Sequence, residues 1–332
     1  MLKSDFYYDL PEELIAQTPV EPRDSSRLLV YNRADGTITH DRFYNLAHYL
    51  SRGDLLVMND SKVFPARLFP VNFEGEVLLL EQKSADVWEC IGRNLKVGRF
   101  IEFSQELTAQ VLEIVNDGNR LIKFSYDGDF YEILDKVGNM PLPPYITEKL
   151  QDKQRYNTVY ADKTGSAAAP TAGLHFTEHV FASLSQKGID TSRITLHVGL
   201  GTFRPVKSEK INEHKMHSER FFLPVETACK IAECKKRGNR VVAVGTTSCR
   251  TLEAVGSVAH NVPQSGSTDI FIIPGYKFKL TDSLLTNFHL PESTLLMLIS
   301  AIMGREEALA AYEEAIRERY RFFSFGDSML IL

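Results

Sequence analysis

Hydrophobic and polar positions follow two different patterns along the chain. From about residue 65 to residue 130, short apolar runs of β type alternate with turn signals; they are residues 77–80, 87–91, 100–103, 111–115 and 121–124. The sequence Asn116-Asp117-Gly118-Asn119 between the last two runs is typical of a hairpin turn. Closely spaced strands without intervening helices predict a small barrel or sandwich. Pro141, Pro143 and Pro144 end the region, and we expect a return linker there.

The rest of the chain alternates between strand and helix patterns. Strands are predicted at residues 54–59, 194–198, 241–244 and 270–273, and helices at 177–186, 226–237, 294–303 and 306–320. A further helix is predicted to begin at Pro11, capped by Asp9. Such alternation favours a largely parallel sheet covered by helices. The fold class predicted is α/β: a larger α/β layered domain, residues 1–64 and 153–332, with an inserted small β-barrel domain, residues 65–152.

Composition sets limits on the class of protein. The 332 residues, 43% of them hydrophobic, are enough for two domains with buried cores. The N-terminus has no signal-peptide pattern and the apolar stretch 295–303 is too short to span a bilayer, so we expect a cytoplasmic protein. The four cysteines form no C-x-x-C pair, which fits a reducing compartment.

Charge is unevenly distributed. The net charge of −5 does not indicate a nucleic-acid-binding protein, but residues 204–250 carry 11 Lys and Arg against 5 Glu. This local excess of six positive charges is explained equally well by a solvated helix surface and by a face that binds phosphates.

A glycine-containing loop from His197 to Pro205 follows the strand predicted at residues 194–198. Gly199 and Gly201 allow the backbone to take a positive φ or to approach a ligand closely, and His197 and Arg204 flank them. In α/β sheets, ligands bind beyond the carboxyl ends of the strands. A tight turn beside a hydrogen-bonded core histidine explains the same residues.

Four other polar segments are candidates for chemistry; they are residues 168–177 with His175, 213–219 with His214 and His217, 245–248 with Thr247 and Ser248, and 286–291 with Asn287 and His289. The segment 245–248 follows a strand and opens a helix, where free amides bind anions, although plain capping by Thr247 or Ser248 is the simpler interpretation.

The spacing of His214 and His217 raises the question of a metal site. The pair lacks the i, i+4 spacing and the glutamate of a zincin helix, and no cysteine supports it, so we expect no metal. Proton transfer or phosphate contact suits these histidines better, because imidazole titrates near ~6.5. Two alternatives remain open from the residues: a metal-dependent hydrolase using His175, His214 and His217, and a non-catalytic RNA-binding protein.

A series of ordered motifs covers the chain from about Phe6 to Met329. The motifs are Asn59-Asp60-Ser61, Pro65-Ala66-Arg67-Leu68, residues 140–146 (MPLPPYI), residues 169–176 (APTAGLHF), the loop 197–205, residues 214–219 (HKMHSE), residues 244–248 (VGTTS), residues 269–272 (DIFI) and residues 285–291 (LTNFHLP). In this order they resemble the S-adenosylmethionine:tRNA ribosyltransferase-isomerase family of bacterial queuosine biosynthesis.

The resemblance implies a reaction and its partners. The ribosyl part of S-adenosylmethionine, used as a co-substrate, would be transferred to 7-aminomethyl-7-deazaguanine at the wobble position of tRNA. It would be rearranged to give epoxyqueuosine, while adenine and methionine leave. The resemblance also implies an active site between an α/β domain and an inserted barrel, with no metal. We expect a monomer that does not contact membranes.

The expected roles follow from residue type and position in a loop. His197 or His175 is the candidate base, and Asp60 is the candidate acid or partner of the sulfonium. Arg204 and Arg250 are expected to hold a tRNA phosphate or the methionine carboxylate, with Thr247 and Ser248 as donors. The other expected substrate-binding residues are Asn59, Arg67, Gly199, Gly201, Thr202, Phe203, His214, His217, Asn287 and His289. Lys235, Lys236 and Arg237 are expected to bind the anticodon arm.

Overall fold

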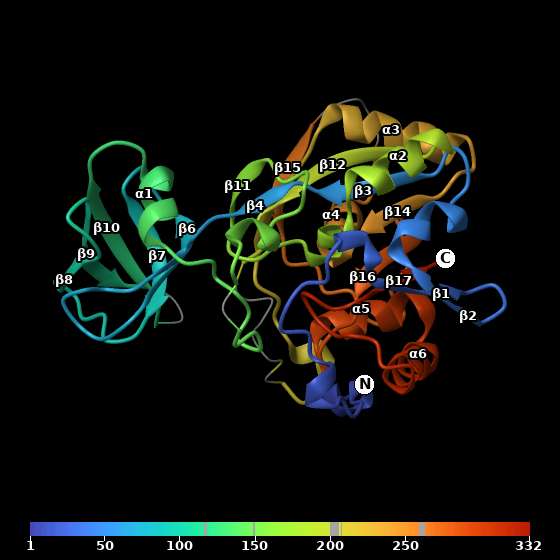
Figure 1. The fold of residues 1–332 in the computed structure, drawn as a ribbon, viewed down its shortest axis with the longest axis horizontal. Helices are drawn as coiled ribbons and strands as arrows, with labels where there is room; N and C mark the ends of the chain where they lie inside the picture. The colour runs from blue at the N-terminus through green and yellow to red at the C-terminus, as the bar shows by residue number, and fades with distance from the viewer. Residues whose placement is uncertain (116–117, 149, 200–205, 207, 259–262) are drawn as a thin grey trace.

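The computed structural model describes residues 1–115, 118–148, 150–199, 206, 208–258 and 263–332. It contains a nine-stranded sheet, a six-stranded sheet and a parallel pair formed by β4 (Ser61–Val63) and β11 (Lys163–Ser166). Figure 1 shows the six-stranded sheet at one end of the molecule, joined by extended segments to a larger body that holds both termini.

The large sheet is mixed. Its strands in spatial order are β15 (Gln264–Thr268), β13 (Glu219–Leu223), β12 (Asp190–Leu196), β3 (Leu55–Asn59), β14 (Val241–Val244), β16 (Ser283–Asn287), β17 (Ser328–Ile331), β1 (Arg27–Asn32) and β2 (Thr37–Arg42). The four central strands β12, β3, β14 and β16 are parallel to one another. The expectation of a largely parallel sheet is therefore correct only for this centre. The flanks are mostly antiparallel: β1 and β2 form a hairpin, and β13 and β17 run against their inner neighbours, whereas β1 is parallel to β17.

Two separate hydrophobic clusters cover the two faces of this sheet. Leu55 and Val57 of β3 belong to a cluster that includes α3 (Val225–Lys236), α4 (Gly245–Val255), α5 (Thr294–Met303) and α6 (Arg305–Arg317). Leu56 and Met58 point the other way and pack with α2 (Glu178–Gln186) and the 3-10 helix η4 (Phe43–Tyr49). The period of two along β3 thus places helices on opposite faces. The four longer predicted helices are confirmed to within about two residues at their starts.

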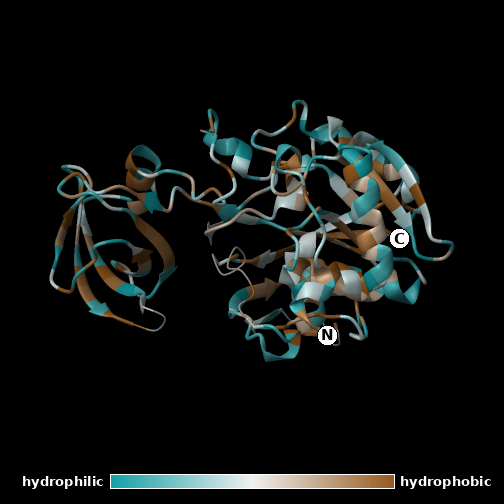
Figure 2. Cartoon of the chain, turned by 90° about the horizontal axis from the view of Figure 1, so that it is seen from below, coloured by the Kyte–Doolittle hydropathy of each residue, from teal (hydrophilic) through white to brown (hydrophobic). Residues whose placement is uncertain are grey.

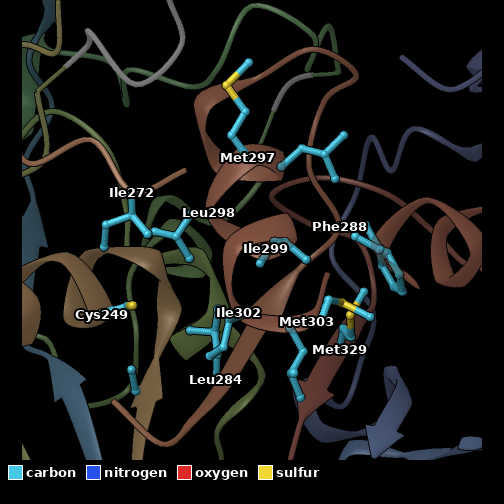
Figure 3. Packing of buried hydrophobic residues seen from close by; sticks show 14 of the residues in the cluster. Cys249, Ile272, Leu284, Phe288, Met297, Leu298, Ile299, Ile302, Met303 and Met329 are labelled. Carbon is cyan, nitrogen blue, oxygen red and sulfur yellow. The ribbon is translucent and has the colours of Figure 1, made fainter. Parts of the chain in front are cut away.

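The strand predicted at residues 270–273 is wrong. These residues are an irregular segment after β15, and Ile272 is 2% exposed. Figure 3 shows Ile272 beside Leu298 of α5 and above Cys249 of α4. The residues are apolar because the segment is buried against two helices. An apolar run alone does not show whether its backbone also pairs with a sheet.

The helix predicted to begin at Pro11 is reduced to one 3-10 turn, η2 (Glu12–Leu14). The chain is extended beyond it, because the backbones of Leu14 and Ala16 both bond to Phe322 near the C-terminus. Pairing with a distant segment outweighs the local helix signal.

The six-stranded sheet is antiparallel and has its own core. Its order is β5 (Arg67–Leu68), β6 (Val77–Gln82), β7 (Val87–Gly92), β10 (Arg120–Tyr126), β9 (Leu107–Ile114) and β8 (Phe100–Glu102). Trp88 and Phe124 pack there against Phe130 of α1 (Phe130–Val137). The sheet curls, and the amide of Val71, just after β5, bonds to Glu102 of β8 at 2.7 Å. All five predicted strands are confirmed; the domain boundaries at residues 65 and 152 stay a prediction.

Hydropathy follows this arrangement. Figure 2 shows hydrophobic positions along the strands of both sheets and polar positions on the outer helices. Within the described ranges, no helix is both long and apolar enough to cross a membrane.

Candidate active site

A pocket lies at the carboxyl ends of the central parallel strands. It is lined by residues that follow β14 and β12 or end β16, and by the loop at 168–172; among them are Gly245, Thr246, Thr247, Val198, Thr286, Asn287, His289, Ala169 and Pro170. Tyr145, from the segment that returns from the six-stranded sheet, completes the wall, and its hydroxyl lies 2.7 Å from Ser324 Oγ. Parallel strands bring these distant segments to one edge of the sheet.

The first turn of α4 lines this pocket, and among the described residues no N-cap side chain bonds to its amides. The helix begins at Gly245, whose φ of 85° suits glycine, and its N-cap residue Val244 supplies no side-chain hydrogen bond. The capping expected from Thr247 or Ser248 is wrong, because the helix begins before them. The free N–H groups and the positive end of the helix dipole favour a negatively charged or electron-rich group.

Asn59 is hydrogen-bonded to several of the segments around the pocket. It is fully buried, and its Nδ2 donates to Leu196 O at 2.9 Å and to Thr247 Oγ1 at 3.3 Å. Its Oδ1 accepts from the amides of Leu196 and Ser61. Asn59 thus joins the ends of β3 and β12 to the start of α4, and its polar atoms are used within the protein.

Two histidines near the pocket are deeply buried. His289 lines it, and its Nε2 lies 2.8 Å from Thr286 Oγ1. His175 has Ser26 Oγ 2.8 Å from Nδ1 and Asn287 Nδ2 3.1 Å from Nε2. Burial lowers the pKa of each ring to about 3, so both are neutral at pH 7.

A second group of residues surrounds a buried carboxylate, Glu219, at the start of β13. Arg250 Nη1 donates to Glu219 Oε2, and the amide of Gly199 donates to Oε1 at 3.1 Å. His217 Nε2 lies 3.1 Å from Oε1 without the geometry of a hydrogen bond. Burial alone would raise the pKa of Glu219, but the neighbouring His217 and Arg250 lower it below its usual value. Glu219 is therefore a carboxylate that holds Arg250 in place.

Arg250 keeps unused donors. Its side chain is 5% exposed, yet Nε and Nη2 have no hydrogen-bond partner in the described part of the chain. A buried N–H without a partner costs about 1–3 kcal/mol, so these atoms indicate a site that a ligand completes.

A third group contains Asp60 and His197. Ser61 Oγ lies 2.9 Å from His197 Nδ1, and burial lowers the pKa of this ring. Asp60 Oδ1 accepts from Thr195 Oγ1 at 2.7 Å, and burial raises the pKa of its carboxyl. Arg193 is an electrostatic neighbour of Asp60, and its guanidinium lies over the ring of Tyr160, 4.4 Å from the centroid. These environments suit a neutral base and a carboxyl whose protonated form is favoured by burial.

The segment 197–199 touches all three groups. His197 contacts Ser61, Val198 lines the pocket, and Gly199 donates to Glu219. The rest of the candidate loop, with Gly201, Thr202, Phe203 and Arg204, lies outside the described residues. The position expected for the start of this loop at the carboxyl edge of the sheet is confirmed.

Other expected site residues lie elsewhere. Arg67 is in β5, where its Nε lies 3.8 Å from Glu76 Oε2. Lys235, Lys236 and Arg237 are at the C-terminal end of α3, and Lys235 Nζ binds Asp282 at 2.7 Å, beside the first residue of β14. They therefore lie at the amino edge of the strands whose carboxyl ends form the pocket.

The remaining polar residues give no metal-binding arrangement. His214 packs edge-on against Phe271, and burial lowers its pKa. Ser248 is fully buried, with no partner for Oγ in the described ranges. No group of three or more His, Cys, Asp or Glu that could hold a metal occurs among the described residues. The hydrolase alternative requires His175, His214 and His217 to lie together. His175 is instead hydrogen-bonded to Ser26 and Asn287.

Sequence reasoning missed Glu219, Ser26 and Tyr145. Glu219 ends the motif at 214–219 and Tyr145 lies in the motif at 140–146, so both stood in candidate segments. Ser26 lies in no motif and is found only through its contact with His175.

Comparison with known proteins covers the whole chain. The model of the queuosine biosynthesis protein family matches residues 3–331. The chain is 58% identical to the S-adenosylmethionine:tRNA ribosyltransferase-isomerase of Acetivibrio thermocellus and 54% identical to that of Caldanaerobacter subterraneus subsp. tengcongensis, over all of each chain. Among solved structures it is similar to the S-adenosylmethionine tRNA ribosyltransferase of Thermotoga maritima. That similarity has 40% identity and a TM-score of 0.59 and covers 99% of this chain and 100% of the other.

Proposed function

This chain belongs to the queuosine biosynthesis protein family, and we propose that it carries out the ribosyltransferase-isomerase reaction of that family at the carboxyl edge of the nine-stranded sheet. The observation that carries this placement is the convergence of the pocket, the buried Arg250 and the pair His197 and Asp60 on the segment 197–199. The family itself is shown by the full-length relatives.

The proposed substrates are S-adenosylmethionine and tRNA carrying 7-aminomethyl-7-deazaguanine. The ribosyl group moves to the aminomethyl nitrogen and is rearranged to the epoxycyclopentanediol of epoxyqueuosine, with loss of adenine and methionine. The sulfonium acidifies the adjacent 5′ C–H, so a base must take that proton, and adenine leaves more readily when an acid protonates it. The wobble base must leave its stack to reach the pocket.

His197 suits the base best among the histidines. One ring nitrogen bonds to Ser61, and the lowered pKa keeps the ring neutral at pH 7. Asp60 suits the acid, because its raised pKa favours the protonated carboxyl. Arg250 suits the methionine carboxylate, since its two unpartnered donors form a planar fork that matches two carboxylate oxygens.

Adenine release tests this proposal. The protein is mixed with S-adenosylmethionine and tRNA bearing the deazaguanine base, and adenine is quantified by chromatography. We expect release that requires both substrates, and a fall of about 10²- to 10⁴-fold for His197→Ala, the range of general acid–base catalysis. His48→Ala, at an exposed histidine, is the control.

Other results of that assay identify the alternatives. Binding of tRNA without adenine release would support a non-catalytic RNA-binding protein. Loss of activity on chelation, restored by a metal, would support the hydrolase. Full activity in His197→Ala would remove His197 from proton transfer.

Binding of the anticodon arm by Lys235, Lys236 and Arg237 gives a separate prediction. The strand β14 has four residues and spans about 13 Å, so the carboxyl edge of the sheet is about that far from the amino edge. A tRNA bound at the carboxyl edge is large enough to reach these three residues as well. Replacing the three by Gln is expected to weaken tRNA binding and to flatten the dependence of log Kd on log salt by about two to three units. Lys230→Gln on the same helix, where Lys230 pairs with Glu226 at 2.9 Å, is the control. An unchanged salt slope would contradict the assignment.

The remaining proposals concern the state of the protein in the cell. We propose a cytoplasmic monomer, the setting in which tRNA and S-adenosylmethionine meet.

A further inference from the structure

An acceptor without a partner stands at the end of β16. Asn287 lines the pocket and is 2% exposed, and its Oδ1 is buried without a hydrogen-bond partner in the described part of the chain. The other polar atom of the same amide, Nδ2, is fully used. It lies 3.1 Å from His175 Nε2 and 3.4 Å from Asp327 O.

The orientation of this amide is fixed by its neighbours. A backbone carbonyl only accepts hydrogen bonds, so the amide atom that faces Asp327 O must be the nitrogen. Nδ2 therefore donates to His175 as well, and Nε2 of that ring must carry a lone pair. Flipping the amide would place two acceptors, Oδ1 and Asp327 O, against each other.

The state of the His175 ring agrees with this orientation. Burial, together with the charges of Arg155, Arg321 and Arg23, lowers its pKa to about 3, so the ring holds one proton at pH 7. With Nε2 accepting, that proton is on Nδ1 and is donated to Ser26 Oγ at 2.8 Å. Phe43 stacks on one face of the ring, with centroids 5.1 Å apart. Both nitrogens of His175 are thus occupied within the protein.

We propose that His175 is a positioning residue that fixes the amide of Asn287, so that Asn287 Oδ1 accepts a hydrogen bond from an N–H group of the heterocyclic base bound in the pocket. The surroundings support a flat, partly apolar ligand: Tyr145, Phe288 and Phe323 line the same pocket. This inference rests on the proposed function, which supplies two bases with N–H donors, adenine and the deazaguanine.

The first test replaces Asn287 with Leu, which has a similar shape and no acceptor. We expect kcat/KM for adenine release to fall by about 10- to 100-fold, because the N–H of the bound base loses its partner. A fall of less than threefold in a folded variant would overturn the proposal. Wild-type activity with the natural substrates is measured alongside, so that failure of the proposed function is seen separately.

A substrate analogue distinguishes the two bases. The co-substrate in which hydrogen replaces the 6-amino group of adenine is used with both proteins. If adenine supplies the donor, the analogue is poor with the wild type, and Asn287→Leu makes little further difference. If the deazaguanine supplies it, the losses from the analogue and from the variant multiply. Either result supports the acceptor role of Asn287.

The second test separates positioning from proton transfer at His175. His175→Gln can place an amide oxygen near the position of Nε2 and accept from Asn287 Nδ2, whereas His175→Leu cannot. We expect the Gln variant to keep kcat/KM within about tenfold, with an unchanged pH profile, and the Leu variant to fall as far as Asn287→Leu. Equal and complete loss in both folded variants would show that the imidazole itself is required, which would overturn the positioning role.

A spectroscopic measurement covers the case in which these variants do not fold. The ¹⁵N chemical shifts of His175 in the wild type should show Nδ1 protonated and Nε2 unprotonated at pH 7. In Asn287→Asp an acceptor replaces Nδ2, so the ring should take up a second proton at that pH. A ring protonated on Nε2 in the wild type would contradict the arrangement.

Discussion

Glu219→Gln is expected to lower the free energy of unfolding by about 3 to 5 kcal/mol, because it leaves the Arg250 guanidinium buried without its counter-charge. Both side chains are nearly inaccessible, at 1% and 5% exposure. The amide nitrogen of the new Gln would also face a donor, because it replaces either the oxygen that accepts from Arg250 or the one that accepts from the Gly199 amide. Urea unfolding at pH 7 measures the change.

The matched control is Glu226→Gln, which removes the same charge from an exposed pair with Lys230. Surface pairs of this kind contribute little to stability, so the two variants should differ several-fold. A loss below about 1 kcal/mol for Glu219→Gln would show that solvent or another carboxylate compensates Arg250.

A double variant separates the structural role of this pair from its role in binding. Replacing both members by apolar residues, as Glu219→Leu with Arg250→Met, removes the unpaired charge, and such replacements are often neutral for stability. We expect the double variant to recover most of the lost stability. Its KM for S-adenosylmethionine should stay raised, since the donors proposed for the methionine carboxylate are absent. If the double variant recovers both the stability and the wild-type KM, Arg250 does not bind the substrate.

The fold could be predicted where the local pattern and the tertiary environment agree. The helices at 177–186 and 294–303 carry apolar spacing with a Thr or Ser cap, and the structure contains both caps, Thr177 and Ser293. The failures come from segments whose conformation is set by distant contacts. Ile272 is buried under two helices without pairing, and residues 14–16 bond to Phe322. Neither contact leaves a local signal.

The position of the site in the fold could be predicted from the sequence, but the hydrogen-bond partners of its residues could not. A loop at the carboxyl end of a central strand had to lie beside its parallel neighbours, and the segment 197–199 does. The partners were not predictable, because Glu219 and Arg250 are 31 residues apart and His175 and Ser26 are 149 residues apart. The sequence also does not show whether the ring nitrogens of a histidine in a motif contact substrate or protein. In the structure His175 is buried and both of its nitrogens contact protein atoms.

Mild acid is expected to destabilise the protein through its buried histidines. The pKa of His175 and of His289 is lowered from 6.5 to about 3 in the folded state, so the unfolded chain binds these protons first. Their stabilising effect is complete above pH 6.5 and is lost as the pH falls toward 3. At 1.36 kcal/mol per pH unit, each removes about 2 kcal/mol between pH 7 and pH 5.

Carboxyl groups also contribute to the dependence of stability on pH, in both directions. Glu219 and Asp54 have lowered pKa values and destabilise the fold when they are protonated, whereas Asp60 and Asp327 have raised values and oppose that trend. Because these carboxyl groups act in opposite directions, we expect the histidines to set most of the slope between pH 7 and pH 5. Urea unfolding at the two pH values should show a loss of at least about 4 kcal/mol in the wild type, because the lowered pKa values of His197 and His214 act in the same direction, and His289→Gln should reduce that loss by about 2 kcal/mol. His48→Gln, at an exposed site, should keep the full slope. Equal slopes in all three proteins would mean that the His289 ring is protonated within the fold near its usual pKa, and its assignment as a neutral ring would then be wrong.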